Sequence, residues 1–459
     1  MIRRTLQSLG IVVAALTLFG AGVAHAGIFR AYLSLTGSDA NPCTLPQPCR
    51  LLPAALAAAN DGGEIWMLDS ANFNVGPVTI DKGIKILAIP GEVGSVVGNG
   101  GDALVVNAPN KDVTLRNLVI LNLSGGLHGV NIVDAGAVHI EKTSINDFGD
   151  TTAACVRYNN TTSTRIFIDD SFLRHCGVAV RATVGGQPTG NLPSIILDNT
   201  RIERGAANTP PATGVWISGC IDVTLRNSMM SRNDNGIMVD SLVAGCASHL
   251  QLFNTTLTRI TDAVQVNSAN GNTALDILVH NSQITNVGSG IHIQHSSIGS
   301  SVTVDITDSM VSSMGGDALT LDNTSTDPNG GINVNLVRTN FTRVGGTTLA
   351  MNAPNGGRVR AWARDTTFAN GGTVVKTTGA GTSVVQASLI RSTVSAATTA
   401  IDHGFGTVRI DGNHFVNMTN SFVNNGSGDI RSLGNNWLSN ATNTTPGFTY
   451  ITPTIIAPI

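Results

Sequence analysis

The sequence predicts an all-β repeat fold, because one short motif recurs through most of the 459 residues. The motif is clearest at Asp222 to Met230, which reads DVTLRNSMM. If Asn227 is position zero of the repeat, successive copies lie 21 to 30 residues apart. The thirteen zero positions are Asn117, Lys142, Asp170, Asn199, Asn227, Asn254, Asn281, Asp308, Arg338, Asp365, Arg391, Gly412 and Gly434. Self-similarity at such a period indicates stacked repeats.

Each copy has the pattern of two short strands joined by a sharp corner. Aliphatic residues usually stand two and four positions before zero, as Val223 and Leu225 do, and an apolar residue stands three after it. Alternation with period two predicts strands. Asn or Asp fills eight of the thirteen zero positions, and these residues tolerate the left-handed backbone of a tight corner.

A second signature lies later in each copy, where a small residue precedes alternating aliphatic residues. Gly214-Val215-Trp216-Ile217 and Gly290-Ile291-His292-Ile293 are examples. One such unit cannot bury its apolar face alone, so the copies must share a core. Propeller blades need a longer period, and the LxxLxLxxN frame of leucine-rich repeats is absent.

These elements resemble the stacked strands of right-handed parallel β-helix proteins, the pectate-lyase-like (pectin lyase fold) superfamily, over roughly Glu64 to Ala441. The resemblance implies a solenoid of about 13 or more coils with a short N-terminal capping helix. At the spacing of paired strands, thirteen coils make a rod on the order of 60 Å long.

The ends of the chain differ from the repeats. Residues 1–26 carry Arg3 and Arg4 before an apolar stretch and end in Ala24-His25-Ala26, the pattern of a cleaved signal peptide, which predicts export. Residues 27–63 form the expected N-terminal cap, with a disulfide loop and a helix over Leu51 to Asn60 that Asp61-Gly62-Gly63 ends. Residues 64–441 form the β-helix, and residues 442–459 are expected to pack over its last coil.

Charge and hydropathy exclude some partners. Charged residues make up 12% of the chain, about half the usual share, and the formal net charge is −3. Such a surface attracts neither nucleic acid nor anionic membranes through charge. No segment after the signal peptide is long and apolar enough to span a bilayer.

The six cysteines predict three local disulfides. Cys43 and Cys49 flank a short loop that contains proline. Cys155 and Cys176, and likewise Cys220 and Cys246, are separated by about one coil, which places each pair near one corner of neighbouring layers. An exported protein meets oxidising conditions, in which such pairs form disulfides.

The position before zero places three carboxylates, Glu141, Asp169 and Asp198, in consecutive layers. At about 5 Å they repel one another by roughly 1 kcal/mol in water and about 3 kcal/mol at an effective dielectric constant of 20. Either a Ca²⁺ ion or arginines must offset this repulsion. The candidate arginines are Arg116, Arg226, Arg174, Arg204, Arg232 and Arg259.

The stretch IFIDDSFL, from Ile166 to Leu173, is similar to the WIDHxxFS stretch of pectate lyases, whose Asp binds Ca²⁺. The resemblance implies Glu141, Asp169 and Asp198 as calcium ligands, with Arg174 or Arg204 as the base of a β-elimination. His does not follow Asp169 here, and the NTD, DD, GHG and RIK elements of polygalacturonase-like hydrolases are missing as a set.

Alternation also predicts the direction of several ring side chains. Trp216, Phe167 and Trp362 should point outward, where Trp216 and Phe167 are candidate sugar-binding platforms; the alternative for Trp216 is burial beneath the loop from Gly205 to Gly214. His292 and His295 lack an evident third metal ligand, so both are expected at the surface.

Two functions follow from these observations. The first is a non-catalytic, exported bacterial protein that presents a long polar face to glycan or another surface component. The second is a Ca²⁺-assisted lyase acting on a uronate-containing polysaccharide. The fold hosts both classes, so only the site can separate them.

Overall fold

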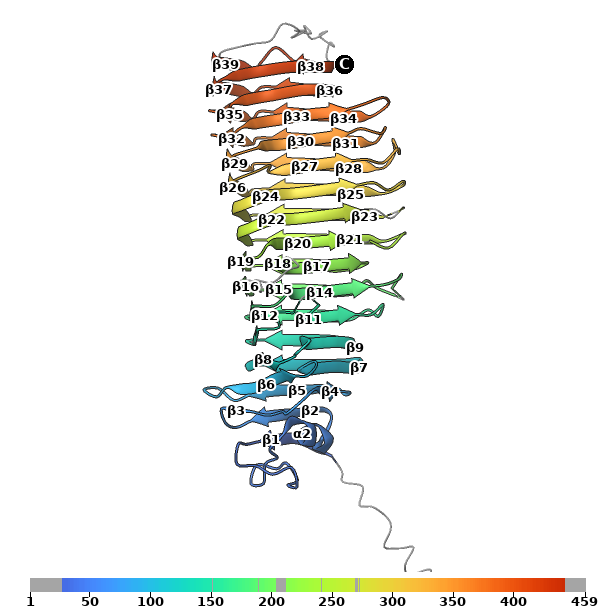
Figure 1. The fold of residues 1–459 in the computed structure, drawn as a ribbon, viewed down its shortest axis with the longest axis vertical. Coiled ribbons are helices and arrows are strands. Elements are labelled where there is room, and N and C mark those ends of the chain that lie inside the picture. Colours follow the sequence, from blue (N-terminus) through green and yellow to red (C-terminus); the bar gives the residue numbers. More distant parts are fainter. Residues whose placement is uncertain are drawn as a thin grey trace, which may run out of the picture.

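The computed structural model describes residues 27–441 except 151, 189, 204–211, 241, 269–270 and 272. It confirms the predicted fold class, a parallel β-helix, with about 15 turns. Strands stack along the long axis of the molecule, and β1 and α2 lie at the opposite end from β39 (Figure 1). The predicted signal peptide, Arg204 and the C-terminal segment 442–459 lie outside the described residues.

Each turn contributes strands to three parallel stacks, named here sheets A, B and C. Sheet A contains β1 (Ile28–Leu33), β2 (Ala59–Met67), β5 (Ile84–Ala88), β7 (Leu104–Arg116), β9 (His128–Glu141), β12 (Arg165–Asp169), β15 (Ser194–Asp198), β18 (Asp222–Arg226), β21 (Ala247–Phe253), β23 (Ala274–His280), β25 (Ser301–Thr307), β28 (Gly331–Val337), β31 (Arg358–Arg364), β34 (Val384–Ile390), β36 (Thr399–Asp411) and β38 (Asn420–Ser432). Strands β7, β9, β36 and β38 bend at a corner, and their first halves belong to sheet C.

Sheet B follows the corner at position zero. It contains β3 (Ala71–Asn72), β6 (Gly94–Asn99), β8 (Leu118–Ser124), β10 (Ser144–Asn146), β13 (Phe172–Arg174), β16 (Arg201–Glu203), β19 (Met229–Ser231), the first halves of β22 (Thr256–Ser268) and β24 (Gln283–His295), β26 (Met310–Met314), β29 (Asn340–Val344), β32 (Thr367–Ala369), β35 (Thr393–Ser395), β37 (His414–Met418) and β39 (Trp437–Ala441).

Sheet C completes each turn and holds the second sequence signature. Its other members are β4 (Val78–Ile80), β11 (Ala154–Asn159), β14 (Val178–Val184), β17 (Thr213–Gly219), β20 (Asn235–Asp240), the second halves of β22 and β24, β27 (Leu319–Asn323), β30 (Thr347–Ala353) and β33 (Thr373–Gly379). The alternation seen in the sequence sets the register, because a shift of one residue would expose the apolar side of a strand.

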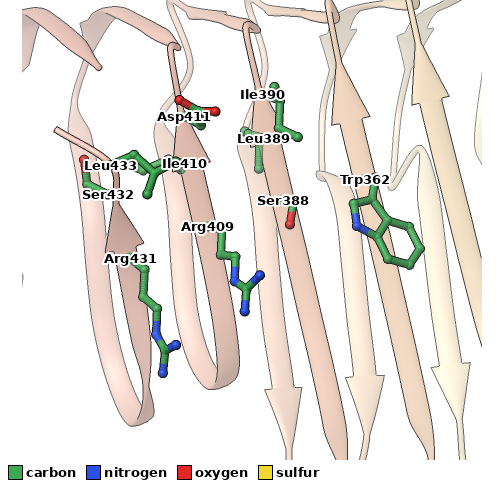
Figure 2. A pocket seen from close by; sticks show the side chains of 10 residues that line it. All are labelled: Trp362, Ser388, Leu389, Ile390, Arg409, Ile410, Asp411, Arg431, Ser432 and Leu433. Carbon is green, nitrogen blue, oxygen red and sulfur yellow. The ribbon is translucent and has the colours of Figure 1, made fainter. Parts of the chain in front are cut away.

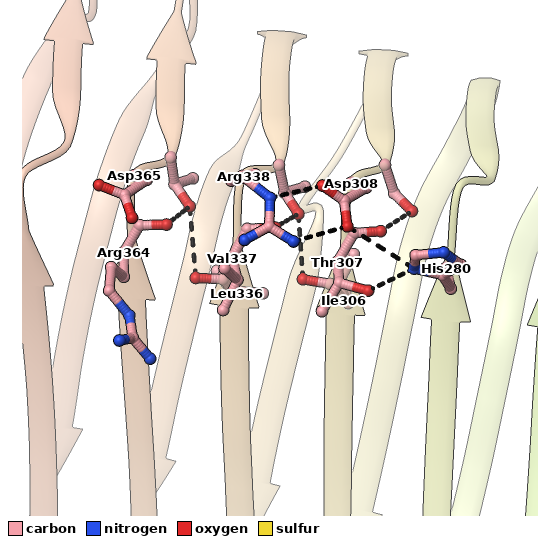
Figure 3. Close-up of polar contacts among 12 residues, drawn as sticks. His280, Ile306, Thr307, Asp308, Leu336, Val337, Arg338, Arg364 and Asp365 are labelled. Atoms are coloured by element: carbon pink, nitrogen blue, oxygen red, sulfur yellow. Dashed lines mark hydrogen bonds and ion pairs between the residues drawn. The ribbon is translucent and has the colours of Figure 1, made fainter.

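The corner between sheets A and B is formed as the sequence predicts. All thirteen zero positions have left-handed backbone, with φ from 46° at Arg391 to 83° at Gly434. Side chains bridge successive corners: Asn254 Nδ2 donates to Asn227 Oδ1 at 2.9 Å, and Arg338 donates to Asp308 (Figure 3). The Ser or Thr at the next position points inward, as buried Ser228 does, and its hydroxyl donates to the Arg226 carbonyl at 2.6 Å.

The interior is filled by the aliphatic residues that the repeat predicts. Val223 and Leu225 are almost completely buried, and the rings of Phe341 and Phe368 stack in successive turns with centroids 5.4 Å apart. The three predicted disulfides are all present, with Cα–Cα distances of 4.6, 5.6 and 5.7 Å.

The single helix of the described residues, α2 (Leu52–Ala58), is shorter than expected. Leu52, Ala55 and Leu56 bury their side chains. Strand β2 begins at Ala59, so Asp61-Gly62-Gly63 lie in a strand and not at the end of a helix. Strand β2 pairs with β1 at Ala59 and again from Glu64, and with β5 from Gly63, while the Gly62 N–H donates to the Gly83 carbonyl; these bonds to neighbouring segments replace helical ones after Ala58. In the described ranges no helix has the length and apolar character to cross a membrane.

Candidate functional site

The outward face of sheet A brings together side chains from successive turns. Its middle row, named here the central column, is in parallel register from β9 to β38. The column consists of His139, Phe167, Ile196, Thr224, Gln251, Leu278, Asp305, Asn335, Trp362, Ser388, Arg409 and Arg431. Parallel strands lie about 4.8 Å apart, so the column is a ladder of closely spaced positions.

The three predicted carboxylates lie beside this column. Asp169 pairs in register with Glu141 on one side and with Asp198 on the other. The outer two have cationic partners: Arg116 forms an ion pair with Glu141, and Arg226 Nη2 lies 3.2 Å from Asp198 Oδ2. Thus arginines at both ends of the row offset part of the repulsion.

Asp169 differs from its neighbours because its side chain has no hydrogen bond or ion pair with the residues that the structure describes. Burial raises the pKa of Asp169, and the charges of Asp198 and Glu141 raise it further. His139 acts in the opposite direction. Within the described ranges, no three His, Cys, Asp or Glu side chains form a group that could hold a metal ion. Calcium ligation by Glu141, Asp169 and Asp198 therefore stays a prediction, and we derive no chemical step through it.

Arg174, the predicted base, lies in β13 of sheet B, beyond the corner that follows Asp169. Its guanidinium carbon is 5.9 Å from the centroid of the Phe172 ring, and it forms no ion pair with the three carboxylates. Arg232, another expected partner of the carboxylates, binds Glu203 at 3.2 Å instead. Catalytic roles for Arg174 and Arg204 stay predictions.

The two predicted aromatic platforms are partly covered. Phe167 stacks on His139 with ring centroids 4.7 Å apart. The Arg181 guanidinium lies over the Trp216 ring at 4.4 Å, and the Trp216 indole nitrogen is buried without an acceptor among the described residues. Neither ring offers a free face as open as that of Trp362, which is 38% exposed.

Trp362 lies at one side of a hollow of about 470 Å³ on sheet A. Figure 2 shows Ser388 between Trp362 and Arg409, and Arg409 and Arg431 extending side by side from adjacent strands. Asp411 and Ile390 border the same space. The full lining is Trp362, Ser388, Leu389, Ile390, Arg409, Ile410, Asp411, Arg431, Ser432 and Leu433.

A second hollow of about 350 Å³ shares Trp362 and Ile390 with the first. Asn335 and Arg364 line it, and Asn335 Nδ2 donates to Asp305 Oδ1 at 2.7 Å. The two hollows make one strip along the face, named here the Trp362 strip. Its indole is flanked by amide, hydroxyl, carboxylate and guanidinium groups, which can exchange hydrogen bonds with a polar ligand.

The surface expectation for His295 was wrong. His295 is completely buried in sheet C, while His292 is partly exposed and lies 3.2 Å from Asp322. The physical reason is the alternation of β24, in which Ile291, Ile293 and His295 face inward.

Comparisons with known proteins find similarity of overall shape. No protein-family profile and no curated protein sequence matches the chain. A GH136 lacto-N-biosidase from Eubacterium ramulus aligns with a TM-score of 0.44 and 10% identity over 84% of this chain and 67% of the other. The catalytic domain of a GH87 α-1,3-glucanase aligns with a TM-score of 0.42 and 8% identity over 84% of this chain and 67% of the other.

A third structure, the A-module of a mannuronan C-5 epimerase from Azotobacter vinelandii, aligns with a TM-score of 0.35 and 9% identity over 86% of this chain and 93% of the other. These scores transfer no site residue to this protein. The assignment as a parallel β-helix rests on the strand pairing of the chain itself.

Proposed function

We propose that this protein is an exported glycan-binding β-helix whose binding surface is the Trp362 strip of sheet A. The observation that carries the proposal is the exposed indole of Trp362 inside an open hollow with polar groups on its border. Sugars present C–H groups on one face and hydroxyls around their edge. An indole can pack against the C–H face, and Ser388, Asp411 and Asn335 can exchange hydrogen bonds with the hydroxyls.

The shape of the strip suits a chain more than a single small molecule. Asn335, Trp362, Ser388, Arg409 and Arg431 are consecutive members of the central column, so they span roughly 19 Å at the usual strand spacing. A polysaccharide can therefore lie across several turns.

Binding without hydrolysis fits the acidic groups of the strip. Canonical glycosidases use two carboxyl groups on either side of the scissile bond. Asp411 is the one carboxylate that lines the first hollow, and the nearby Asp429 lies 2.9 Å from Arg431 as its ion-pair partner. The disulfides fit the predicted export, because such bonds persist in oxidising compartments.

The test compares Trp362→Ala with Trp437→Ala in affinity electrophoresis and calorimetry across neutral and acidic polysaccharides. Trp437 is 56% exposed on sheet B, so it controls for loss of an exposed indole elsewhere. We expect the wild type and Trp437→Ala to bind one glycan class alike, and Trp362→Ala to bind it roughly tenfold more weakly. Equal binding by all three would exclude the Trp362 strip, and no binding across the panel would remove the glycan function.

The calcium-assisted lyase is the second candidate, and one observation favours it. The Asp169 side chain has no hydrogen bond or ion pair with the described residues and lies between two carboxylates, which is an arrangement that a cation would stabilise. Calcium calorimetry on the wild type and Asp169→Ala, followed by an absorbance assay for unsaturated uronate products, tests it. Calcium binding that is lost in the variant, together with unsaturated product from the wild type, would support the lyase. The absence of both calcium heat and product in the wild type would exclude it.

A further inference from the structure

A group of cationic and aromatic side chains lies on sheet C, outside the Trp362 strip. Arg157 of β11, Arg181 of β14 and Trp216 of β17 occupy one outward row in parallel register. All three are half-buried. The sequence signature that predicted an outward Trp216 did not show that two arginines precede it in the stack.

Among the described residues, neither of the two guanidinium groups forms an ion pair. Their hydrogen bonds go to neutral oxygens: Arg157 Nη1 to Asn131 Oδ1 at 3.3 Å, and Arg181 Nη1 to the Thr152 carbonyl at 3.4 Å. Burial lowers the pKa of Arg181, and the charge of Arg157 lowers it further. The residues that the structure does not describe include no Asp or Glu, so no missing side chain supplies the counter-charge.

One carboxylate whose charge acts near these arginines is Asp102. It accepts a hydrogen bond from Asn131 Nδ2 at 2.6 Å, and its charge acts on His128. His128 has its pKa lowered to about 4, first by burial and also by Arg157 and Arg181, while Asp102 opposes the shift. At neutral pH His128 is therefore uncharged, and its Nδ1 accepts the Ala154 N–H at 3.0 Å.

Trp216 adds a buried donor to this row. Its indole nitrogen has no acceptor among the described residues, and the Arg181 guanidinium lies over the ring at 4.4 Å. A buried donor left without a partner destabilises the fold, and two like charges side by side add to the cost. A row that contains donors and cations but no anion is incomplete as a purely structural arrangement.

We propose that Arg157, Arg181 and Trp216 form a binding site for an oxyanion group, that is, a carboxylate, sulfate or phosphate. The planar guanidinium offers two parallel N–H groups to such a ligand, and charge-assisted hydrogen bonds of this kind are the strong ones. The site lies on a different sheet from the Trp362 strip, so it is independent of the proposed glycan function. A bound anion removes the repulsion between the two arginines.

The experiment titrates the full mature chain with inorganic phosphate, sulfate or glucuronate at constant ionic strength and follows the thermal unfolding midpoint and tryptophan fluorescence. The variants are Arg157→Gln and Arg181→Gln. Arg165→Gln is the matched control, because Arg165 is an exposed strand arginine on sheet A. We expect saturable responses in the wild type and in Arg165→Gln, and apparent affinity reduced by roughly tenfold or more in the two site variants. The anion with the tightest response identifies the ligand chemistry.

Two further outcomes keep the proposal falsifiable. Without added anion, Arg157→Gln should be at least as stable as the wild type, since it loses a repulsive contact. Trp216→Phe, which removes the indole donor, should weaken the thermal response and lose the fluorescence change. A response of equal size in all variants would show a general salt effect and overturn the site, as would no response in the wild type.

Discussion

Arg338 and Asp308 occupy equivalent corners of consecutive turns, and the Arg338 guanidinium donates two hydrogen bonds to the Asp308 carboxylate. Nε lies 2.6 Å from Oδ1 and Nη2 lies 2.8 Å from Oδ2 (Figure 3). Arg391 and Asp365 repeat the arrangement with both distances at 2.9 Å. Each arginine has left-handed backbone, near φ 50° and 46°. The corner therefore combines a left-handed backbone conformation, which few residue types adopt readily, with an ion pair between side chains of successive turns.

The backbone requirement predicts effects of different size for two substitutions of Arg338. Arg338→Val should lower the thermal unfolding midpoint, because a β-branched residue is strained at positive φ. Arg338→Asn should stay close to the wild type, because Asn tolerates this backbone and is the usual residue at the corner. Circular dichroism melts measure both. A midpoint for Arg338→Val equal to that of Arg338→Asn would show that the corner does not constrain the residue.

The same pair gives a dependence on pH. The hydrogen bonds that Arg338 donates to the Asp308 carboxylate lower the pKa of Asp308 below the ordinary value of 3.8. The stabilisation is therefore complete above pH 3.8 and is lost as the pH falls through the lowered pKa. The difference in midpoint between the wild type and Arg338→Ala should shrink in that acidic range. A constant difference would mean that the ion pair does not contribute.

Asp169 should behave in the opposite way. Its pKa is raised, so its ionised form weakens the fold above the raised pKa, and the penalty disappears below the ordinary value of 3.8. Asp169→Asn should therefore increase the unfolding free energy at pH 7, by up to about 1 kcal/mol after solvent screening. Denaturant titration at pH 7 and at acidic pH measures the change.

Asp198→Asn is the matched control for Asp169→Asn. Asp198 accepts from Asn227 at 2.9 Å and pairs with Arg226, so its replacement removes favourable contacts. It should give no stabilisation at pH 7. If both variants stabilise the fold equally, the carboxylates act only through mutual repulsion and the arginines contribute nothing.

The repeat was visible in the sequence because the interior permits few residue types. Val223, Leu225 and Ser228 face inward, and their equivalents vary little in polarity from turn to turn. The second left-handed corner, five residues after zero, was not predicted. It holds residues as different as His175, Arg232 and Ala396, because the pairing of the flanking strands imposes its backbone and composition carries no signal.

The site was less predictable because its parts come from different turns. Trp362, Ser388, Arg409 and Arg431 are separated by 26, 21 and 22 residues, so no local motif unites them. Aligning the position three before zero in successive repeats would have placed them in one row. That alignment predicts which residues share the row but does not predict the hollow beside Trp362. The hollow depends on the sizes of the neighbouring side chains and on the side-chain conformations of the arginines.

The disulfides predict a ranking of stability losses. Cys220–Cys246 spans 26 residues and Cys43–Cys49 spans 6. In the loop-entropy model, removal of the longer crosslink costs about 3.5 kcal/mol and removal of the shorter about 2 kcal/mol. The double variants Cys220→Ala/Cys246→Ala and Cys43→Ala/Cys49→Ala test this in denaturant titrations. A larger loss for the short loop would show that local packing, and not loop closure, dominates.

His295 predicts an acid-sensitive step in unfolding. The ring is completely buried, and neither nitrogen has a hydrogen-bond partner among the described residues. Burial lowers its pKa from the ordinary 6.5, with Asp327 opposing the shift. Below pH 6.5 the unfolded chain binds the proton more readily than the folded protein does. Stability is therefore complete above pH 6.5 and falls as the pH drops towards the lowered pKa, by at most about 1.4 kcal/mol per pH unit for this group.

His295→Leu removes that titration and replaces two unsatisfied nitrogens with apolar atoms of similar volume. The variant should equal or exceed the wild type at pH 7.5 and exceed it by a growing margin as the pH falls from 6.5 to 5. His414→Leu is the control for replacing an imidazole at an exposed position. Denaturant titrations at a series of pH values give the slopes. Parallel slopes for the wild type and His295→Leu would mean that folding does not lower the pKa of the His295 imidazole. That result would contradict the prediction.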